Sequence, residues 1–142
     1  MPKSTIDKAV DRILDANLNR AKEGLRVCEE IARFIIENRK LTAELKGLRH
    51  ALRGLSKRLF SLKEQLGPRR SLKDVGFSIY AQELRRKDCP DIFFANMQRV
   101  KESLRVLEEF AKLQKPAAAL GFKRLRYKLY EVERRSAQRF SF

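Results

Sequence analysis

Two stretches of this chain carry the same polar side chains at the same spacing, and those side chains have the chemistry to hold an anion. Residues 16–33 read ANLNRAKEGLRVCEEIAR and residues 95–112 read ANMQRVKESLRVLEEFAK, with eleven of eighteen positions identical. A shared helical habit does not explain why polar positions match. Guanidinium groups bind phosphate oxygens, and amides hydrogen-bond to small molecules. The chain is therefore a duplicated unit. The matching polar pairs are Asn17 with Asn96, Arg20 with Arg99, and Arg26 with Arg105.

A second, shorter repeat follows each copy. Residues 45–50 read LKGLRH and residues 122–127 read FKRLRY, so each half also carries Leu-Arg followed by an aromatic ring. Arg49 and Arg126 are candidates for binding a phosphate group. The ring that follows each arginine suits stacking on a heteroaromatic ligand, because a planar hydrogen-bonding side chain occurs at both places. These rings are His50 and Tyr127.

Carboxylates accompany the repeated arginines. At about 100° per residue, Asn17 falls within the apolar stripe of its helix and Arg20 lies at the edge of that stripe. A buried amide needs hydrogen-bonding partners, so these positions indicate a cleft with arginine at its rim. Glu23 and Glu102 lie one turn from the arginines, where they can orient the guanidinium groups or hold a metal ion.

The segment between the two halves is a third candidate element. Residues 68–76 read PRRSLKDVG, which combines basic groups, a hydroxyl, one carboxylate and a glycine. Such a loop can direct backbone N–H groups at a phosphate, with Asp74 available for magnesium. Arg69, Ser71 and Gly76 are the other candidates in this loop.

Purely structural roles are the alternative for each of these groups. Asn17 can bridge to a neighbouring backbone group instead of facing a ligand. The spacing of Glu23, Arg26 and Glu30 is typical of ordinary ion pairs on a helix surface. A lone histidine, His50, is more often structural than catalytic. The loop can be a solvated connection.

Charge is the outstanding feature of the composition. The net charge of +15 and the pI near 10.3 favour anionic partners such as nucleic acid, anionic lipid or small phosphorylated ligands. The sequence has no zinc-finger spacing, basic zipper or RNA-binding aromatic motif, and no Walker A or glycine-rich kinase loop. The sequence shows no membrane span or signal peptide, and its two cysteines give no disulfide framework, so we expect a cytoplasmic protein.

The spacing of apolar residues predicts an all-α fold. We expect a first helix from about Thr5 to Asn38 with a capping signal at Ser4, a second beginning at Thr42, and a short helical piece over 79–86. Prolines 90 and 116 suit the first turns of a third helix through Gln114 and of a fourth. Short connections predict two helical hairpins, related by a pseudo-twofold axis and forming a four-helix bundle. The halves are about 5–66 and 88–140 of one domain, joined by a loop at about 67–78.

The predicted core follows the helical period. In the first helix it comprises Leu14, Leu18, Ala21, Leu25, Cys28 and Ala32. In the second helix it comprises Leu45, Leu48, Leu52, Leu55, Leu59 and Leu62. In the fourth helix it comprises Leu120, Leu125, Leu129 and Val132.

Taken together and in order, these motifs resemble one family over almost the whole chain. It is the helical domain found fused to the N-terminus of bacterial thiamine-phosphate synthases, and also found alone, whose activity is ATP-dependent phosphorylation of hydroxymethylpyrimidine phosphate. The motifs are RILDANLNRAKEGLRV at 12–27, LKxLR at 45–49, DVG at 74–76, ANxxRVxESLRVLEE at 95–109 and LRYxLYExE at 125–133.

The resemblance implies an ATP-dependent kinase of thiamine biosynthesis, and we expect magnesium to accompany the ATP and infer the following roles for single residues. Asp74, Arg20 and Arg99 are the expected catalytic residues, and Asp74 with Glu23 the expected magnesium ligands. In one respect the sequence departs from the family pattern, since Arg69 is followed by Arg70 where an acidic residue often stands. The expected ligand-binding residues are Asn17, Arg26, Arg49, Arg69, Ser71, Gly76, Asn96, Glu102, Arg105, Arg126 and Tyr127.

Three other functions fit the sequence less well. A nucleic-acid-binding bundle fits the charge but not the repeated A-N-x-x-R motif. A regulatory module that binds a thiamine precursor without chemistry, or a mutase-like helical enzyme, would need no nucleotide. The expected partners are therefore ATP and a phosphorylated pyrimidine, with thiamine-phosphate synthase as a possible functional partner and no membrane.

Overall fold

Four long helices make up the described part of the molecule. The computed structural model describes residues 2–59, 65–78 and 84–140, and within these ranges there is no β-strand. The long helices are α1 (Thr5–Phe34), α2 (Arg39–Leu59), α4 (Cys89–Ala111) and α5 (Pro116–Ala137), and a short 3₁₀ turn, η1, spans Ser71–Lys73. None of the described helices combines the length and the apolar run that a membrane crossing needs.

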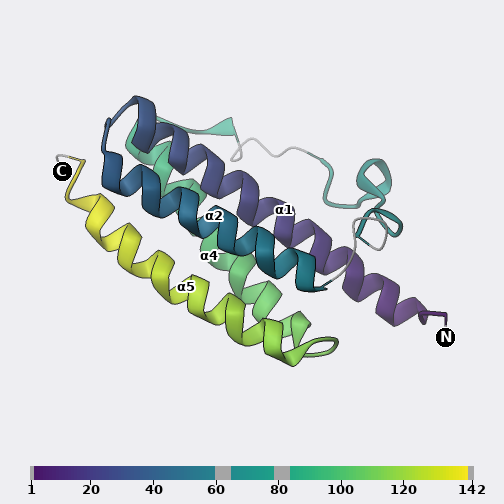
Figure 1. Cartoon of the computed structure of the whole chain (residues 1–142). Helices are drawn as coiled ribbons and strands as arrows, with labels where there is room; N and C mark the ends of the chain where they lie inside the picture. The colour runs from purple at the N-terminus through teal and green to yellow at the C-terminus, as the bar shows by residue number, and fades with distance from the viewer. Residues whose placement is uncertain (1, 60–64, 79–83, 141–142) are drawn as a thin grey trace.

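The helices form the predicted bundle of two hairpins. The α1 helix packs on α2 and α4, and α5 packs on α4 and α2, so the four enclose a common core. In Figure 1 the hairpin partners run antiparallel, and α4 lies behind α2. The loop that contains η1 lies beside the N-terminal half of α1, at the end of the molecule where the chain begins (Figure 1). The all-α prediction is confirmed.

The helix ends follow local capping chemistry. Ser4 and Asp7 form a capping box at the start of α1, as predicted. The predicted end of α1 at Asn38 was wrong, because α1 stops at Phe34 and Asn38 belongs to the next helix: its Oδ1 accepts a hydrogen bond from the backbone N–H of Leu41 at 2.8 Å. This contact starts α2 at Arg39, three residues before the predicted position.

The second hairpin begins where its prolines indicate. The side chain of Asp88 caps α4, Pro90 lies in the first turn of α4, and Pro116 opens α5. The α4 helix ends at Ala111 rather than at Gln114. Most of the predicted helical piece at 79–86 lies outside the described residues.

The predicted core is buried, with one exception. All six apolar positions predicted for α1 are buried, and so are those predicted for α2, apart from Leu62, which lies outside the described residues. The prediction that Leu120 belongs to the core was wrong, since its side chain is 50% exposed. It lies about 160° around the helix from the fully buried Phe122, given about 100° per residue.

The two copies of the repeat meet where α1 crosses α4. A Cβ atom built on Gly24 would lie 2.6 Å from Cγ2 of Val100 and 3.1 Å from the carbonyl oxygen of Asn96. Cys28, one turn further along, donates its thiol to the carbonyl of Phe93 at 3.4 Å, and burial raises its pKa to about 12. Glycine is therefore needed at position 24 for the close approach of the two helices.

Gly24→Ala should destabilise the protein. The added methyl would meet a β-branched side chain and a backbone carbonyl, and overpacking of this kind typically costs about 1–3 kcal/mol, more than the gain of roughly 0.5–1 kcal/mol in helix propensity. Thermal unfolding measures the difference.

Gly47→Ala is the matched control, because a Cβ there would meet no atom within 4 Å. The control should raise the melting temperature. A similar rise for Gly24→Ala would contradict the proposed close contact.

Candidate functional site

Asp15 joins the loop to α1. Its side chain is buried, and both of its carboxylate oxygens accept hydrogen bonds from Arg69, at 2.8 Å from Nε and 2.6 Å from Nη2. The side-chain amide of Gln65 donates to the same carboxylate at 2.8 Å. The hydrogen bond to Asp15 raises the pKa of Arg69 above its ordinary value. The start of the loop is thus fixed against the helix by a bidentate ion pair.

A cleft of about 540 Å³ lies between the outer face of α1 and this loop. We call it the α1–loop cleft. It brings together three candidates from the repeat with three from the loop: Asn17, Arg20, Glu23, Arg69, Ser71 and Asp74. Its other lining residues are Ala9, Arg12, Ile13, Asp15, Ala16, Asn19 and Arg70.

Asn17 is buried and hydrogen-bonded on both sides of its amide. Its Nδ2 donates to the carbonyl of Ile13 at 2.9 Å, and its Oδ1 accepts from Arg20 at 3.5 Å. The helix therefore holds the amide in place, and the amide in turn orients the guanidinium of Arg20 at the cleft rim. These contacts agree with the alternative role given for Asn17 above, in which its side chain bridges to a neighbouring backbone group.

The arginines of the cleft differ in their availability to a ligand. Arg69 is occupied by Asp15. Within the described part of the chain, Arg12, Arg20 and Arg70 have no carboxylate within ion-pair distance. Three guanidinium groups around one cleft, without acidic partners among these residues, make it a strong candidate for binding phosphate.

Two carboxylates of the cleft could contribute to a magnesium site. Glu23 and Asp74 both line it, and one oxygen of Asp74 accepts a hydrogen bond from the backbone N–H of Gly76 at 2.7 Å. Among the described residues there is no group of three or more acidic, His or Cys side chains that could hold a metal ion. Magnesium commonly uses one or two carboxylates together with substrate phosphates and water, and a magnesium role for Glu23 and Asp74 stays a prediction.

The second copy of the repeat does not line this cleft. Asn96 donates to the carbonyl of Ile92 at 2.8 Å, as Asn17 does to Ile13, but Arg99 and Glu102 are exposed on α4. The residue that corresponds to Asp15 is Phe94, whose ring packs against Phe140 at 5.5 Å. The second copy therefore lacks the carboxylate that fixes the loop on α1. The assignment of its residues to a ligand stays a prediction.

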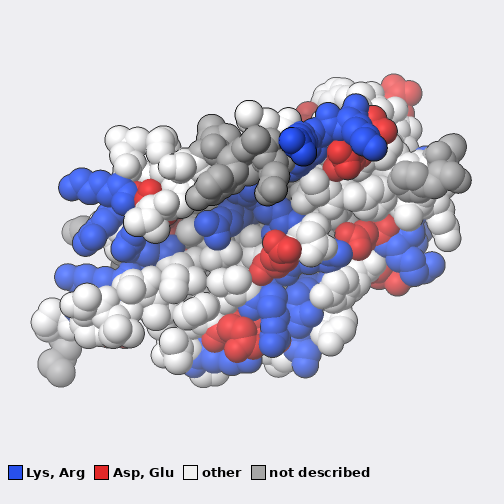
Figure 2. Space-filling model, turned by 180° about the vertical axis from the view of Figure 1, so that it is seen from behind, with Lys and Arg blue, Asp and Glu red and all other residues white. Residues whose placement is uncertain are grey.

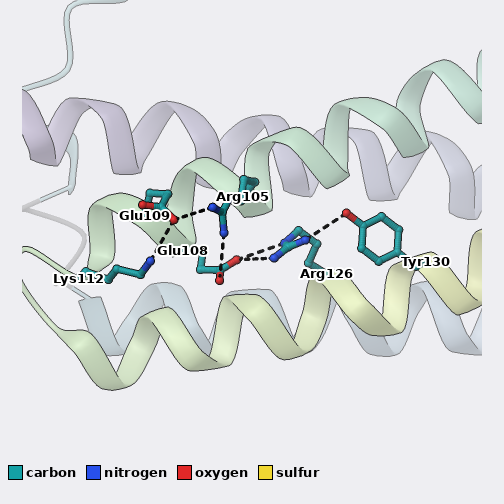
Figure 3. A network of polar contacts seen from close by, with 6 residues as sticks. All are labelled: Arg105, Glu108, Glu109, Lys112, Arg126 and Tyr130. Carbon is teal, nitrogen blue, oxygen red and sulfur yellow. Dashed lines mark hydrogen bonds and ion pairs between the residues drawn. The ribbon is translucent and has the colours of Figure 1, made fainter.

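Four other candidate arginines hold buried glutamates. In the first half, Arg49 donates to Glu29 at 2.8 Å and Arg26 lies 3.5 Å from it. Residues at the matching positions of the second half make the same contacts. Glu108 accepts from Arg126 at 2.8 Å and lies 3.4 Å from Arg105, as Figure 3 shows. Arg49 and Arg126 thus join the two helices of their hairpins, whereas Arg26 and Arg105 lie on the same helix as the glutamate that each contacts. Their binding to substrate stays a prediction.

The candidate rings lie on the surface. His50 is exposed on α2. Tyr127 is 57% exposed and packs edge-on against Tyr130 at 5.9 Å. The hydroxyl of Tyr130 accepts from Arg126 at 3.1 Å, which continues the network in Figure 3. Neither His50 nor Tyr127 lines the α1–loop cleft.

Sequence reasoning missed Asp15, Glu29 and Glu108. These three side chains are at most 6% exposed, and each is paired with an arginine from another segment. Their position in the sequence could have indicated these pairs. A carboxylate on the buried face of an amphipathic helix needs a cationic partner. Arg12 and Asn19 were also missed as residues of the cleft.

Basic side chains dominate the end of the molecule that holds the loop. Figure 2 views the protein from behind, so that the N-terminal end is at the left, and Lys and Arg side chains project there. Toward the middle of this face, acidic side chains alternate with basic ones (Figure 2). The arginines that line the α1–loop cleft, Arg12, Arg20, Arg69 and Arg70, add positive charge that attracts anionic ligands.

Glu29→Gln should lower stability at neutral pH and weaken its acid dependence. Burial acts to raise the pKa of Glu29, but the hydrogen bond and charge of Arg49 and the charge of Arg26 outweigh it and lower the pKa. Ionised Glu29 therefore stabilises the fold above its ordinary pKa of about 4.3, and this contribution is lost as the pH falls through the lowered folded value. Losing the carboxylate should cost about 1–3 kcal/mol at pH 7.

Urea unfolding at pH 7 and pH 3 measures both effects. The gap between wild type and Glu29→Gln should shrink at the lower pH. Glu30→Gln, which alters an exposed pair with Arg26 on the same helix, is the control and should change stability much less. A gap that stays constant with pH would contradict the role of ionised Glu29.

Asp15→Asn should loosen the loop without unfolding the bundle. It removes the charge that holds Arg69, so trypsin should cut after Arg69 or Arg70 at least several times faster than in wild type. Glu133→Gln breaks a different ion pair, with Lys101, and should leave this cleavage rate unchanged. Equal cleavage of wild type and Asp15→Asn would show that the ion pair does not fix the loop.

Comparison with known proteins agrees with the resemblance seen in the motifs. The chain is 47% identical over 126 residues to thiamine-phosphate synthase of Synechocystis sp., covering 88% of this chain and 35% of that protein. Similar matches are to the thiamine-phosphate synthases of Nostoc punctiforme, 40% identical over 92% of this chain and 36% of the relative, and of Rhodopirellula baltica, 39% identical over 89% and 34%. The chain thus spans about a third of the length of these relatives. No solved structure matches it significantly.

The family match covers most of the residues described above. The model of the ThiD2 family matches residues 12–135, which include both copies of the repeat, the loop and the two arginine–glutamate networks. With relatives this similar along almost its whole length, the chain belongs to the ThiD2 family.

Proposed function

We propose that this protein transfers the γ-phosphoryl group of ATP to hydroxymethylpyrimidine phosphate and so makes the diphosphate for thiamine biosynthesis. The observation that supports the proposal is the α1–loop cleft, whose lining includes Arg12, Arg20 and Arg70 together with Glu23 and Asp74. Family membership and the names of the relatives support the thiamine context.

The chemistry of this transfer suits a site without a histidine. An oxygen of the substrate's phosphate group attacks the γ-phosphorus of ATP, and the bond from that phosphorus to the β–γ bridging oxygen breaks, which releases ADP. The attacking oxygen is already ionised at neutral pH, because the second pKa of a phosphate monoester is about 6. No general base is required, and charge neutralisation and positioning supply the catalysis.

The residues of the cleft have roles that follow from their chemistry. Arg20, held by Asn17, would neutralise charge on the transferred group, as arginines do in phosphoryl transfer. The amide of Asn19, which lines the cleft, would hydrogen-bond to the edge of the aminopyrimidine. Glu23 and Asp74 would hold magnesium, which when bound supplies positive charge to the phosphates.

Thiamine-phosphate synthesis is the activity named for the relatives. A synthase of that kind is the proposed consumer of the diphosphate, and hence the functional partner of this chain.

Arg20→Ala should separate catalysis from folding. Incubation with ATP, magnesium and hydroxymethylpyrimidine phosphate, followed by chromatography of the products, should show diphosphate for wild type and a loss of about 10²–10³ in kcat for Arg20→Ala. The melting temperature should change little, because Arg20 is exposed and makes no ion pair with the described residues.

Arg33→Ala is the matched control. Arg33 is an exposed arginine in the last turn of the same helix, far from the cleft, and its loss should leave turnover unchanged. Equal loss of activity in both variants would refute the role of Arg20. If wild type forms no product, the proposal fails: stabilisation by the pyrimidine phosphate alone would then indicate a binding module, and salt-sensitive binding of nucleic acid would indicate the nucleic-acid alternative.

A further inference from the structure

A second cleft adjoins the first at the N-terminal end of α1. It has a volume of about 970 Å³ and is bordered on one side by residues 2–12 and on the other by residues 67–70. We call it the N-terminal cleft. Lys3, Lys8, Arg12, Arg69 and Arg70 line it together with a single carboxylate, Asp11. Its lining also includes uncharged or apolar surface from Pro2, Thr5, Ala9, Gly67 and Pro68.

The two clefts share one wall. Ala9, Arg12, Arg69 and Arg70 line both. Arg69 is held by Asp15 and so fixes the position of this wall. Arg12 and Arg70, which make no ion pair with any described residue, are the two cations within reach of ligands on both sides. A charge shared by two anionic ligands is what transfer between them requires.

We infer that the two substrates of the proposed reaction occupy the two clefts separately, with the nucleotide in the N-terminal cleft and the pyrimidine phosphate in the α1–loop cleft. This inference rests on the proposed function. The nucleotide is the larger ligand, and the N-terminal cleft is the larger of the two. The rings of Pro2 and Pro68 also give this cleft an apolar surface against which a purine base can pack.

The smaller cleft fits the smaller substrate. It carries the side-chain amide of Asn19, which donates to Asp15 at 3.3 Å and has an oxygen that can accept a hydrogen bond from the exocyclic amine of an aminopyrimidine. The phosphate of that substrate would then point to Arg12 and Arg70. There its oxygen attacks the γ-phosphorus of the nucleotide on the other side, and ADP leaves through the N-terminal cleft. Both substrates therefore bind to the first half of the duplicated chain.

Equilibrium dialysis tests this assignment without any need for turnover. The probes are a non-hydrolysable ATP analogue with magnesium and, in a separate cell, hydroxymethylpyrimidine phosphate. Lys8→Glu reverses a charge in the N-terminal cleft only, and should weaken the analogue about tenfold, close to 1.4 kcal/mol, while changing the pyrimidine phosphate less than twofold. Asn19→Ala should show the opposite pattern.

Lys46→Glu is the control for net charge. Lys46 is exposed on α2 and lines neither cleft, so its reversal should alter neither affinity by more than twofold. Equal effects of Lys8→Glu and Lys46→Glu, or a loss of pyrimidine phosphate binding in Lys8→Glu, would overturn the assignment of the clefts.

The assignment and the proposed function fail in different ways. Product formation by wild type, together with unchanged analogue binding in Lys8→Glu, would refute the assignment and leave the kinase activity standing. The expected binding pattern without product would refute phosphoryl transfer and leave the assignment of the two clefts. A wild type that does not bind the analogue would refute both.

Discussion

Buried carboxylates along α1 determine how the rest of the molecule is arranged around that helix. Asp11, Asp15 and Glu29 are at most 5% exposed, and a buried charge is tolerated only when it is paired and hydrogen-bonded. Each of the three meets this requirement with a different segment. Asp11 accepts from Lys3 and from Gln114 in the connection between α4 and α5, Asp15 from Arg69 in the loop, and Glu29 from Arg49 in α2. In a chain of net charge +15, these few acidic groups decide which basic residues are positioned and which remain available for ligands.

The two duplicated halves share one kind of ion pair and differ in one carboxylate. Both halves join their helices through a buried glutamate, Glu29 or Glu108, and an arginine of the following helix. Only the first half has a carboxylate that holds a loop over its A-N-x-x-R motif, because Phe94 stands where Asp15 would be. The close crossing at Gly24 then lets the second half support α1 directly. We therefore assign ligand binding to the first half, as part of the proposed function.

Local rules were enough to predict the fold, but they did not reveal the ion pairs. The 3.6-residue period, the capping box at Ser4 and the helix-opening prolines act within a few residues, so the helices and the core could be predicted from the sequence. The prediction of a buried Leu120 was wrong because the apolar stripe of α5 includes Phe122 instead. The partners of Asp15 and Glu29 are 54 and 20 residues away, and only the packed bundle brings them together. For that reason the sequence placed Arg69 and Arg49 among ligand-binding residues, whereas in the structure both hold carboxylates.

Hydrogen exchange with bound ligands tests most directly the central claim that one half of the duplicated fold binds both substrates. The amides of residues 65–78 should exchange more slowly with a non-hydrolysable ATP analogue, and again with hydroxymethylpyrimidine phosphate. Residues 95–106 of the second copy should show little change with either ligand. Protection of residues 95–106 by one ligand, with the loop unchanged, would contradict the account and place that ligand on the second copy.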